Sequence, residues 1–281
     1  MAMSADGSRL HLQHGPIDLI IEAWGSPADV TDCYRRSWER FDGLLEELVA
    51  ELVPLRRPLN GHRFTGAVAA RMATAVGRVD GSLTPMAAVA GAVADEIVAA
   101  GRSPRLERLY VNNGGDIALH LGPGAAFEVG VVPDPRRPRV VGALTLRSTD
   151  RARGVATSGR HGRSLSLGIA DAVTVISGSA ALADAAATRI ANAVDLPGHP
   201  SIERVPAAEI DPDSDLGRQP VTVAVSALGD RDRARALERG RSEASRHVEA
   251  GCIDAGVLCL DGRIVGVGAP TSMALGALDG G

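Results

Sequence analysis

Residues 183–188 of the sequence read Ala-Asp-Ala-Ala-Ala-Thr, within a predicted helix from Ser179 to Val194. On a helix, residues four apart lie one above the other, so Asp184 and Thr188 direct their oxygen atoms from the same face. A carboxylate and a hydroxyl in this arrangement can bind a hard cation such as Mg²⁺, which takes one or two protein carboxylates and completes its ligand shell with water or phosphate oxygens. The alternative is an aspartate and a threonine on an exposed helix face without a ligand.

A second polar segment precedes this helix. Residues 112–116 read Asn-Asn-Gly-Gly-Asp and follow a short apolar run that we expect to be a strand. Glycine pairs permit positive φ and expose backbone N–H groups, and both properties suit the binding of an anion or a nucleotide. Because these residue types are also ordinary turn formers, a tight turn between two strands is the alternative. The candidate ligand-binding residues here are Asn112, Gly114, Gly115 and Asp116.

A third polar segment lies between these two. Residues 154–159 read Gly-Val-Ala-Thr-Ser-Gly, which we interpret as a loop, and side chains that can carry positive charge follow at 160, 161 and 163. Hydroxyl, backbone and guanidinium donors together can hold a phosphate group, whereas the alternative is a solvated loop with arginine on the surface. The candidate residues are Thr157, Ser158 and Gly159 for ligand binding, and Arg160 and His161 for catalysis.

The composition excludes several classes of protein. All 30 basic residues are arginine, so the chain cannot hold pyridoxal phosphate as a lysine Schiff base or supply the lysine of a P-loop. Aromatic residues make up 2% of the chain and the formal net charge is −4, which disfavours nucleic acid as a partner. No apolar stretch reaches the ~18 residues of a membrane span, so we expect a cytoplasmic protein without membrane contact. Whether it forms a homo-oligomer stays open.

Predicted strands gather in groups separated by helices, which indicates an α+β fold with a largely antiparallel sheet packed with helices. The expected strands are residues 9–13, 17–24, 106–111, 117–121, 127–132, 142–146, 170–176 and 221–228, with a hairpin over 257–267 that turns at Asp261-Gly262. The expected helices are residues 27–52, 64–79, 86–100, 179–194 and 230–250, and residues 206–219 are expected to form a polar loop.

Taken in order, the polar segments resemble the ApbE superfamily, whose best-known members are FAD:protein FMN transferases. That family has Asn-x-Gly-Gly-Asp, Val-Ala-Thr-Ser-Gly, Val-Thr-Val and Ala-Asp-Ala-x-Ala-Thr in sequence, found here at 112–116, 155–159, 173–175 and 183–188. Residues 11–18 and 84–91 look closer still to an ApbE-like branch of bacteria and archaea. The resemblance implies a single ApbE-like domain over residues 1–281 with its motif core at 84–195, and we expect residues 270–281 to be a flexible tail.

The resemblance also implies a site. In the transferases, the aspartate and threonine of the last motif help to bind Mg²⁺ at the pyrophosphate of FAD, which assigns this role to Asp184 and Thr188. Cleavage of the pyrophosphate would depend on positioning and on charge stabilisation at the leaving AMP. A threonine hydroxyl of a partner protein would accept FMN.

The chain departs from the transferase pattern in two places. The transferases begin a helix with Ala-Lys-Gly where this chain has Val89-Ala90-Gly91, and they carry His-x-x-Asp-Pro in a segment whose counterpart, residues 163–171, lacks it. Losing a cation beside a pyrophosphate removes about 2–4 kcal/mol of charge stabilisation. Arg160 or Arg163 could supply that charge instead.

Three functions stay open. The leading hypothesis is an ApbE-like enzyme that binds Mg²⁺ and a flavin nucleotide or a similar small molecule, and that cleaves FAD or transfers FMN from it. The second is a non-catalytic flavin-binding module. The third is an enzyme on the same scaffold that acts on a small carboxylate or cyclic metabolite with Arg160, His161 and Asp171.

Overall fold

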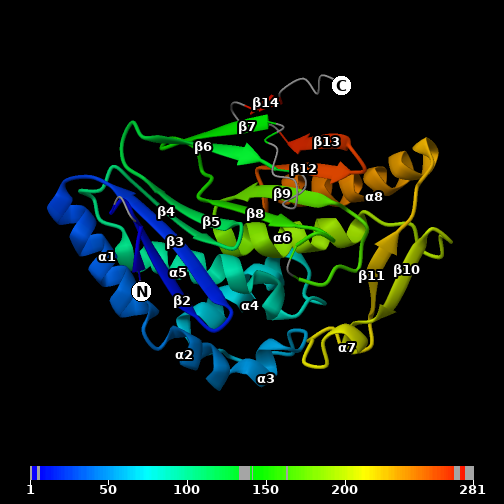
Figure 1. Ribbon diagram of the computed structural model, residues 1–281, viewed down its shortest axis with the longest axis horizontal. Coiled ribbons are helices and arrows are strands. Elements are labelled where there is room, and N and C mark those ends of the chain that lie inside the picture. Colours follow the sequence, from blue (N-terminus) through cyan, green and yellow to red (C-terminus); the bar gives the residue numbers. More distant parts are fainter. Residues whose placement is uncertain are drawn as a thin grey trace. The chain divides into compact units, whose positions relative to one another are not determined.

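The computed structural model describes residues 2–4, 7–132, 140, 142–162, 164–268 and 273–275 (Figure 1). The chain divides into two compact units. The first comprises Met1–Phe127, Thr145–Ala156 and Ile176–Ala185, and the second comprises Glu128–Leu144, Thr157–Val175 and Ala186–Gly281.

The first unit is built on an antiparallel sheet. Its strands follow the order β1 (Ala2–Met3), β2 (Arg9–His14), β3 (Ile17–Trp24), β4 (Arg108–Asn113), β5 (Asp116–Leu121) and β8 (Gly154–Ser158), of which β8 ends in the second unit. Side chains of β3 alternate between buried and partly exposed along the strand. One face of the sheet therefore supplies the core, as the period of two in a strand requires.

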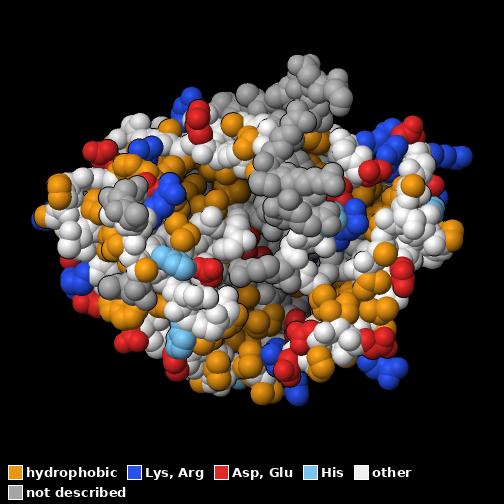
Figure 2. Space-filling view, in the orientation of Figure 1, with side chains coloured by type: hydrophobic (Ala, Val, Ile, Leu, Met, Phe, Trp, Pro, Cys, Tyr) orange, Lys and Arg blue, Asp and Glu red, His pale blue; other side chains and the backbone are white. Residues whose placement is uncertain are grey.

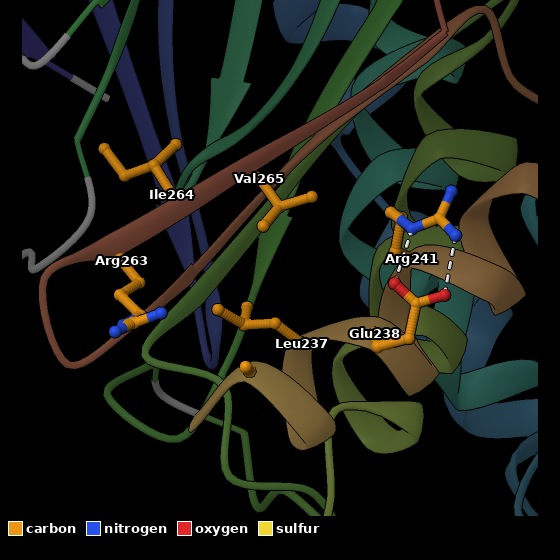
Figure 3. A pocket seen from close by; sticks show the side chains of 7 residues that line it. Leu237, Glu238, Arg241, Arg263, Ile264 and Val265 are labelled. Atoms are coloured by element: carbon orange, nitrogen blue, oxygen red, sulfur yellow. Dashed lines mark hydrogen bonds and ion pairs between the residues drawn. The ribbon is translucent and has the colours of Figure 1, made fainter. Parts of the chain in front are cut away.

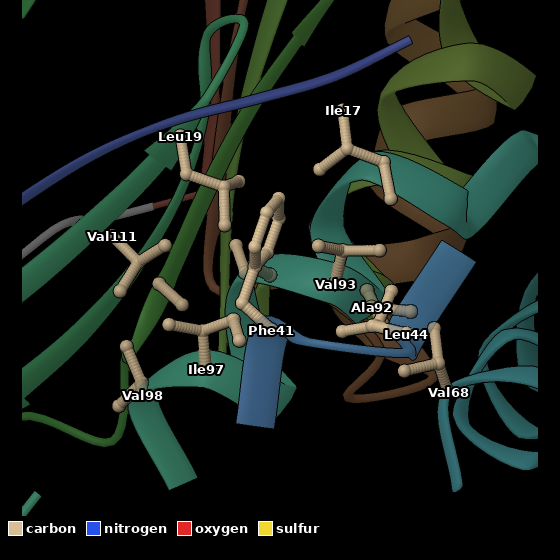
Figure 4. Close-up of a cluster of buried hydrophobic side chains, with 14 of the residues drawn as sticks. Ile17, Leu19, Phe41, Leu44, Val68, Ala92, Val93, Ile97, Val98 and Val111 are labelled. Atoms are coloured by element: carbon tan, nitrogen blue, oxygen red, sulfur yellow. The ribbon is translucent and has the colours of Figure 1, made fainter. Parts of the chain in front are cut away.

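Helices cover the buried face of this sheet. They are α1 (Pro27–Phe41), α2 (Leu44–Ala50), α3 (Leu52–Leu55), α4 (Ala67–Val79), the 3₁₀ turn η1 (Pro85–Ala88) and α5 (Val89–Gly101). Helix α5 packs on β4 and β5 and also contacts α1 and α4. Figure 4 shows apolar side chains of these helices and strands pointing into one buried cluster, which includes Leu19, Phe41, Val93, Ile97 and Val111. Burial of this apolar surface is the main force that holds the unit together.

The prediction of one helix over residues 27–52 is wrong. The chain leaves the helix at Asp42, and Gly43 has φ +78°, in the left-handed region that glycine adopts without strain. A new helix begins at Leu44, so the apolar spacing that suggested one helix in fact serves two. The start was predicted correctly, because Ser26 Oγ accepts the N–H of Asp29 and Pro27 occupies the first turn.

The second unit holds the remaining elements, some of which begin or end in the first. Its strands are β9 (Ala172–Ser177), β12 (Ala255–Leu260) and β13 (Arg263–Gly268), the pair β10 (Ile202–Pro206) and β11 (Pro220–Val225), and a small sheet of β6 (Ala126–Val131), β7 (Gly142–Arg147) and β14 (Met273–Leu275). Its helices are α6 (Ala180–Ala193), whose first six residues belong to the first unit, α7 (Ala207–Ile210) and α8 (Asp230–Glu249). The predicted β12–β13 hairpin is confirmed, with positive φ at Asp261 and Gly262.

Three local predictions need correction. The expected loop over residues 154–159 is strand β8 up to Ser158, since Val155 pairs with Ile117 of β5. The expected polar loop over 206–219 includes the short helix α7. Within the expected tail, residues 273–275 pair with β7, and the other residues of 270–281 lie outside the described residues.

The described surface is mixed in charge. On the face shown in Figure 2, arginine side chains alternate with aspartate and glutamate among apolar groups. None of the helices in the described part of the chain combines the length and the apolar character that a membrane span requires.

Candidate functional site

Two aspartates link the first turns of α5 and α6. Asp95 of α5 accepts hydrogen bonds from the backbone N–H groups of Ala180 (3.0 Å) and Ala181 (2.9 Å), at the start of α6. In return, Asp184 of α6 accepts one from the N–H of Gly91 (3.0 Å), at the start of α5. N–H groups in the first turn of a helix have no partner within that helix. Each aspartate therefore completes the first turn of the other helix.

This link depends on close approach of the two backbones. A Cβ atom on Gly91 would lie 2.2 Å from the carbonyl oxygen of Ala180, and a Cβ on Gly154 of β8 would lie 2.1 Å from the nitrogen of Ala180. No side chain fits at either position without displacing backbone. The start of α6 is thus held between α5 and β8, and Asp184 lies one turn further along.

Asp184 sits in an environment that opposes its negative charge. The residue is half-buried, and loss of solvation to the surrounding protein is the main reason why its pKa lies well above the usual value. The negative charge of Asp116 raises the pKa further. Hydrogen bonds from the backbone N–H groups of Gly91 and Ala90 act in the opposite direction. Two carboxylates that share a poorly solvated site favour a bound proton or a cation.

Asp116 is placed by the hairpin between β4 and β5. Gly114 and Gly115 both have positive φ (+65° and +114°), as a two-residue hairpin turn requires. The side-chain oxygen of Asn112 accepts the N–H of Gly115 at 2.8 Å, which closes the turn. The turn interpretation of residues 112–116 is therefore confirmed, and it brings Asp116 and Asp184 into one electrostatic site.

Asn113 is a residue that the sequence analysis did not single out. Its side chain is 5% exposed, and its amide group donates to the carbonyl oxygen of Ala90 at 3.1 Å. It therefore fixes the β4–β5 hairpin to the start of α5. The signal was present in the sequence, since Asn113 continues the alternation of Leu109 and Val111 toward the buried face.

The remaining predicted residues lie in the second unit. The hydroxyls of Thr157 and Thr174 share a hydrogen bond of 2.9 Å. Asp171 brings Arg160 and His161 together, because its Oδ1 accepts from Arg160 Nε and Nη2 (2.9 and 2.6 Å) and lies 3.2 Å from His161 Nε2. The other positions are Ser158 at the end of β8, Gly159 with φ +155°, and Thr188 on α6 one turn after Asp184. Arg163 lies outside the described residues.

Two pockets lie away from the residues predicted from sequence. One, of about 290 Å³, lies between α8 and β13, where Leu237 and Val265 point toward each other and Arg241 donates to Glu238 (Figure 3). Because the guanidinium groups of Arg241 and Arg263, which also lines the pocket, are each paired with an acid, the pocket offers apolar contact rather than a reactive group. The other, of about 340 Å³, lies along α4 and the first turn of α6, and Asp95 is among its lining residues.

The raised pKa of Asp184 predicts a pH dependence of stability. The folded protein binds this proton more tightly than the unfolded chain, so the stability that protonation contributes is present at low pH and is lost as the pH rises toward the raised pKa. We expect Asp184→Asn to become progressively more stable than the wild type as the pH rises above about 4, the usual pKa of an aspartate, toward the raised pKa of Asp184. Urea unfolding of both proteins in EDTA measures this difference, and a difference that does not change with pH would contradict the shift.

A family model and several relatives match the sequence of this chain. A family described as AbpE bacteria matches residues 1–266. A UPF0280 protein from Methanococcoides burtonii is 39% identical over 121 residues, which are 42% of this chain and 49% of that protein. Another, from Methanopyrus kandleri, is 34% identical over 172 residues, 61% of this chain and 66% of that protein. The chain spans about half the length of two of these relatives, 49% of the protein from Methanococcoides burtonii and 46% of one from Methanothrix thermoacetophila.

One solved structure is similar over nearly the whole chain. The flavin transferase ApbE from Vibrio cholerae matches 92% of this chain and 96% of its own, with a TM-score of 0.50 and 13% sequence identity. At this identity the similarity concerns the fold alone. The predicted ApbE-like α+β fold is confirmed.

Proposed function

The chain belongs to the AbpE bacteria family, and with it to the ApbE-like superfamily, and on that premise we propose that it binds Mg²⁺ and a flavin nucleotide and cleaves the pyrophosphate of FAD. The reaction breaks one P–O bond of the pyrophosphate. AMP leaves, and the phosphoryl group of FMN passes to the oxygen of water or of an acceptor hydroxyl, which releases one proton.

The observation that carries this proposal is the pair Asp184 and Asp116. Their negative charges oppose each other in a site where desolvation by the surrounding protein already disfavours charge, and a divalent cation would relieve that cost. No group of three or more acidic, histidine or cysteine side chains gathers as a metal site among the described residues, and Mg²⁺ needs only one or two carboxylates. The residues present fit the ion: Asp184 and Asp116 would hold it, together with the Thr188 hydroxyl. When bound, Mg²⁺ would stabilise the charge that develops on the leaving AMP.

Backbone N–H groups at the start of α5 would supply part of the positive charge that a lysine supplies in the transferases. The position that carries lysine in the transferases is Ala90, whose N–H group contacts Asp184 from the start of α5. The N-terminus of a helix carries a partial positive charge. Part of the missing charge is therefore supplied by the end of α5, which supports retention of a negatively charged ligand.

The polar segments would bind the nucleotide. We assign Asn112, Gly114, Gly115 and Asp116 of the hairpin, and Thr157, Ser158 and Gly159 after β8, to flavin-nucleotide binding. Arg160 and His161 are the proposed catalytic side chains besides Asp184, and Asp171 orients both of them.

One incubation tests the proposal. Purified protein is mixed with FAD and Mg²⁺, and AMP and FMN are separated by chromatography, with EDTA in a parallel sample. We expect metal-dependent release of AMP. Stoichiometric retention of FAD without release would instead indicate a flavin-binding module, and neither retention nor release would indicate a different substrate, such as a small carboxylate.

His161 has its own test. His161→Gln is expected to lower the rate of AMP release about 100-fold, since removal of a group that transfers protons typically costs this much. His199→Gln is the matched control, because His199 also lies beside an aspartate of the second unit (3.4 Å from Asp232). Equal rates in the two variants would remove His161 from the mechanism.

A further inference from the structure

We propose that Asp95 is a positioning residue for the metal site: by holding the first turn of α6 against α5, it sets where the Asp184 carboxylate lies. This inference rests on the proposed function, because it gives Asp95 a role in metal binding. Asp95 itself belongs to none of the motifs that the sequence analysis singled out, and it would touch neither the ion nor the nucleotide.

The hydrogen bonds of Asp95 require a carboxylate. Its Oδ1 accepts from Ala180 and its Oδ2 accepts from Ala181, so each oxygen takes one backbone N–H group. Asparagine has one oxygen, and its NH₂ group would face the second N–H group as donor against donor. Only aspartate among side chains of this shape can accept both bonds.

A capping residue in the segment of α6 itself could not position α6 against α5 as Asp95 does. Ser179 already caps α6 from its own chain segment, since its Oγ accepts the N–H of Leu182. A local cap stabilises the end of a helix but does not fix its position against a neighbour. The bonds from Asp95 cross from α5 to α6, and therefore fix the register between the two helices.

Asp95 keeps this place at an energetic cost. It lies on a helix whose neighbouring residues Val93, Ala94, Ile97 and Val98 are buried and apolar, and burial raises its pKa although the two N–H groups lower it. An apolar side chain would pack there without that cost. The hydrogen bonds that hold the start of α6 therefore explain why a carboxylate occupies this position.

The register matters because Asp184 of α6 forms a hydrogen bond with the start of α5. The first turn of α6 is fixed by Asp95 at its start, and one turn later Asp184 reaches the N–H of Gly91. If Asp95 releases the start of α6, the distance between Asp184 and Asp116 is free to change. Groups that orient metal ligands without touching the metal typically change the affinity 10- to 100-fold when removed.

The test compares Asp95→Asn with Glu96→Gln. Glu96 is the adjacent acid on α5 and pairs with Arg40 and Arg71 at 2.7 and 3.0 Å, so the control removes a charge and two ion pairs while leaving the hydrogen bonds between α5 and α6 in place. The first readout is the Kd of Mn²⁺, used as a paramagnetic probe for the Mg²⁺ site and measured by electron paramagnetic resonance. The second is hydrogen exchange of the Ala180 and Ala181 amides.

We expect Asp95→Asn to raise the Kd of Mn²⁺ about 10-fold and to speed exchange at Ala180 and Ala181, while Glu96→Gln changes neither more than about twofold. A loss of global stability alone would not change the Kd as long as the protein stays folded, which urea unfolding verifies. If the wild type and Asp95→Asn bind Mn²⁺ equally, the inference is overturned and the proposed function stands. If the wild type binds no Mn²⁺, both are overturned.

Discussion

Replacement of Asp184 by asparagine is expected to lower the rate of Mg²⁺-dependent AMP release from FAD about 1000-fold and, at neutral pH, to increase the stability of the protein. A 1000-fold loss corresponds to about 4 kcal/mol of transition-state stabilisation, within the several kcal/mol that a bound metal supplies. Asparagine keeps the shape of aspartate and can still accept the N–H of Gly91, but it carries no charge to offset that of the ion. It also removes one of two carboxylates whose negative charges oppose each other in a poorly solvated site.

The opposite signs of these two effects make the prediction specific. Most substitutions destabilise a protein, whereas replacement of a residue that is retained for function at the expense of stability makes the protein more stable. Asp18→Asn serves as the control, because Asp18 lies on β3, far in sequence from the site motifs, its side chain is 45% exposed, and it forms an ion pair with His11. A full rate of AMP release in Asp184→Asn would remove this residue from the site, and a lower stability at neutral pH would show that its charge supports the fold.

The elements that were predicted well carry their signal locally. Ser26 and Pro27 mark the start of α1 through their own backbone preferences, and Asp261-Gly262 marks a hairpin turn. Gly43 shows the limit of such patterns. The apolar spacing continues on both sides of it as if along one helix, whereas the extended backbone of Asp42 and the left-handed backbone of Gly43 separate α1 from α2.

The candidate site was predictable only in part, because its contacts join segments far apart in the sequence. Asp184 and Asp116 could be chosen from their motifs, yet neither motif shows that α5 supplies backbone N–H groups to Asp184. Asp95 offered one local hint, because Asp95 and Glu96 are the only charged residues in the otherwise apolar sequence of α5. Its hydrogen-bond partners lie 85 and 86 residues further along the sequence, a separation that the periodicity of helices and strands cannot indicate.

Gly91→Ala is expected to destabilise the protein by at least about 3 kcal/mol, and to abolish AMP release at temperatures where the wild type is folded. Alanine is favoured over glycine by about 1 kcal/mol inside a helix, so any loss must come from the surroundings. The surroundings are backbone: the added Cβ would lie 2.2 Å from the carbonyl oxygen of Ala180 and 2.7 Å from the nitrogen of Ala181. Relief requires α5 and α6 to separate, which breaks the hydrogen bonds that Asp95 and Asp184 accept.

Gly77→Ala provides the matched comparison on α4. Its Cβ would meet only the Leu59 side chain at 3.4 Å, an ordinary contact, so this variant is expected to gain about 1 kcal/mol from helix propensity alone. Urea unfolding of the two variants separates propensity from close approach. If Gly91→Ala were as stable as Gly77→Ala, then α5 and α6 would not meet at this distance in solution, and the mutual capping by Asp95 and Asp184 could not hold the site together.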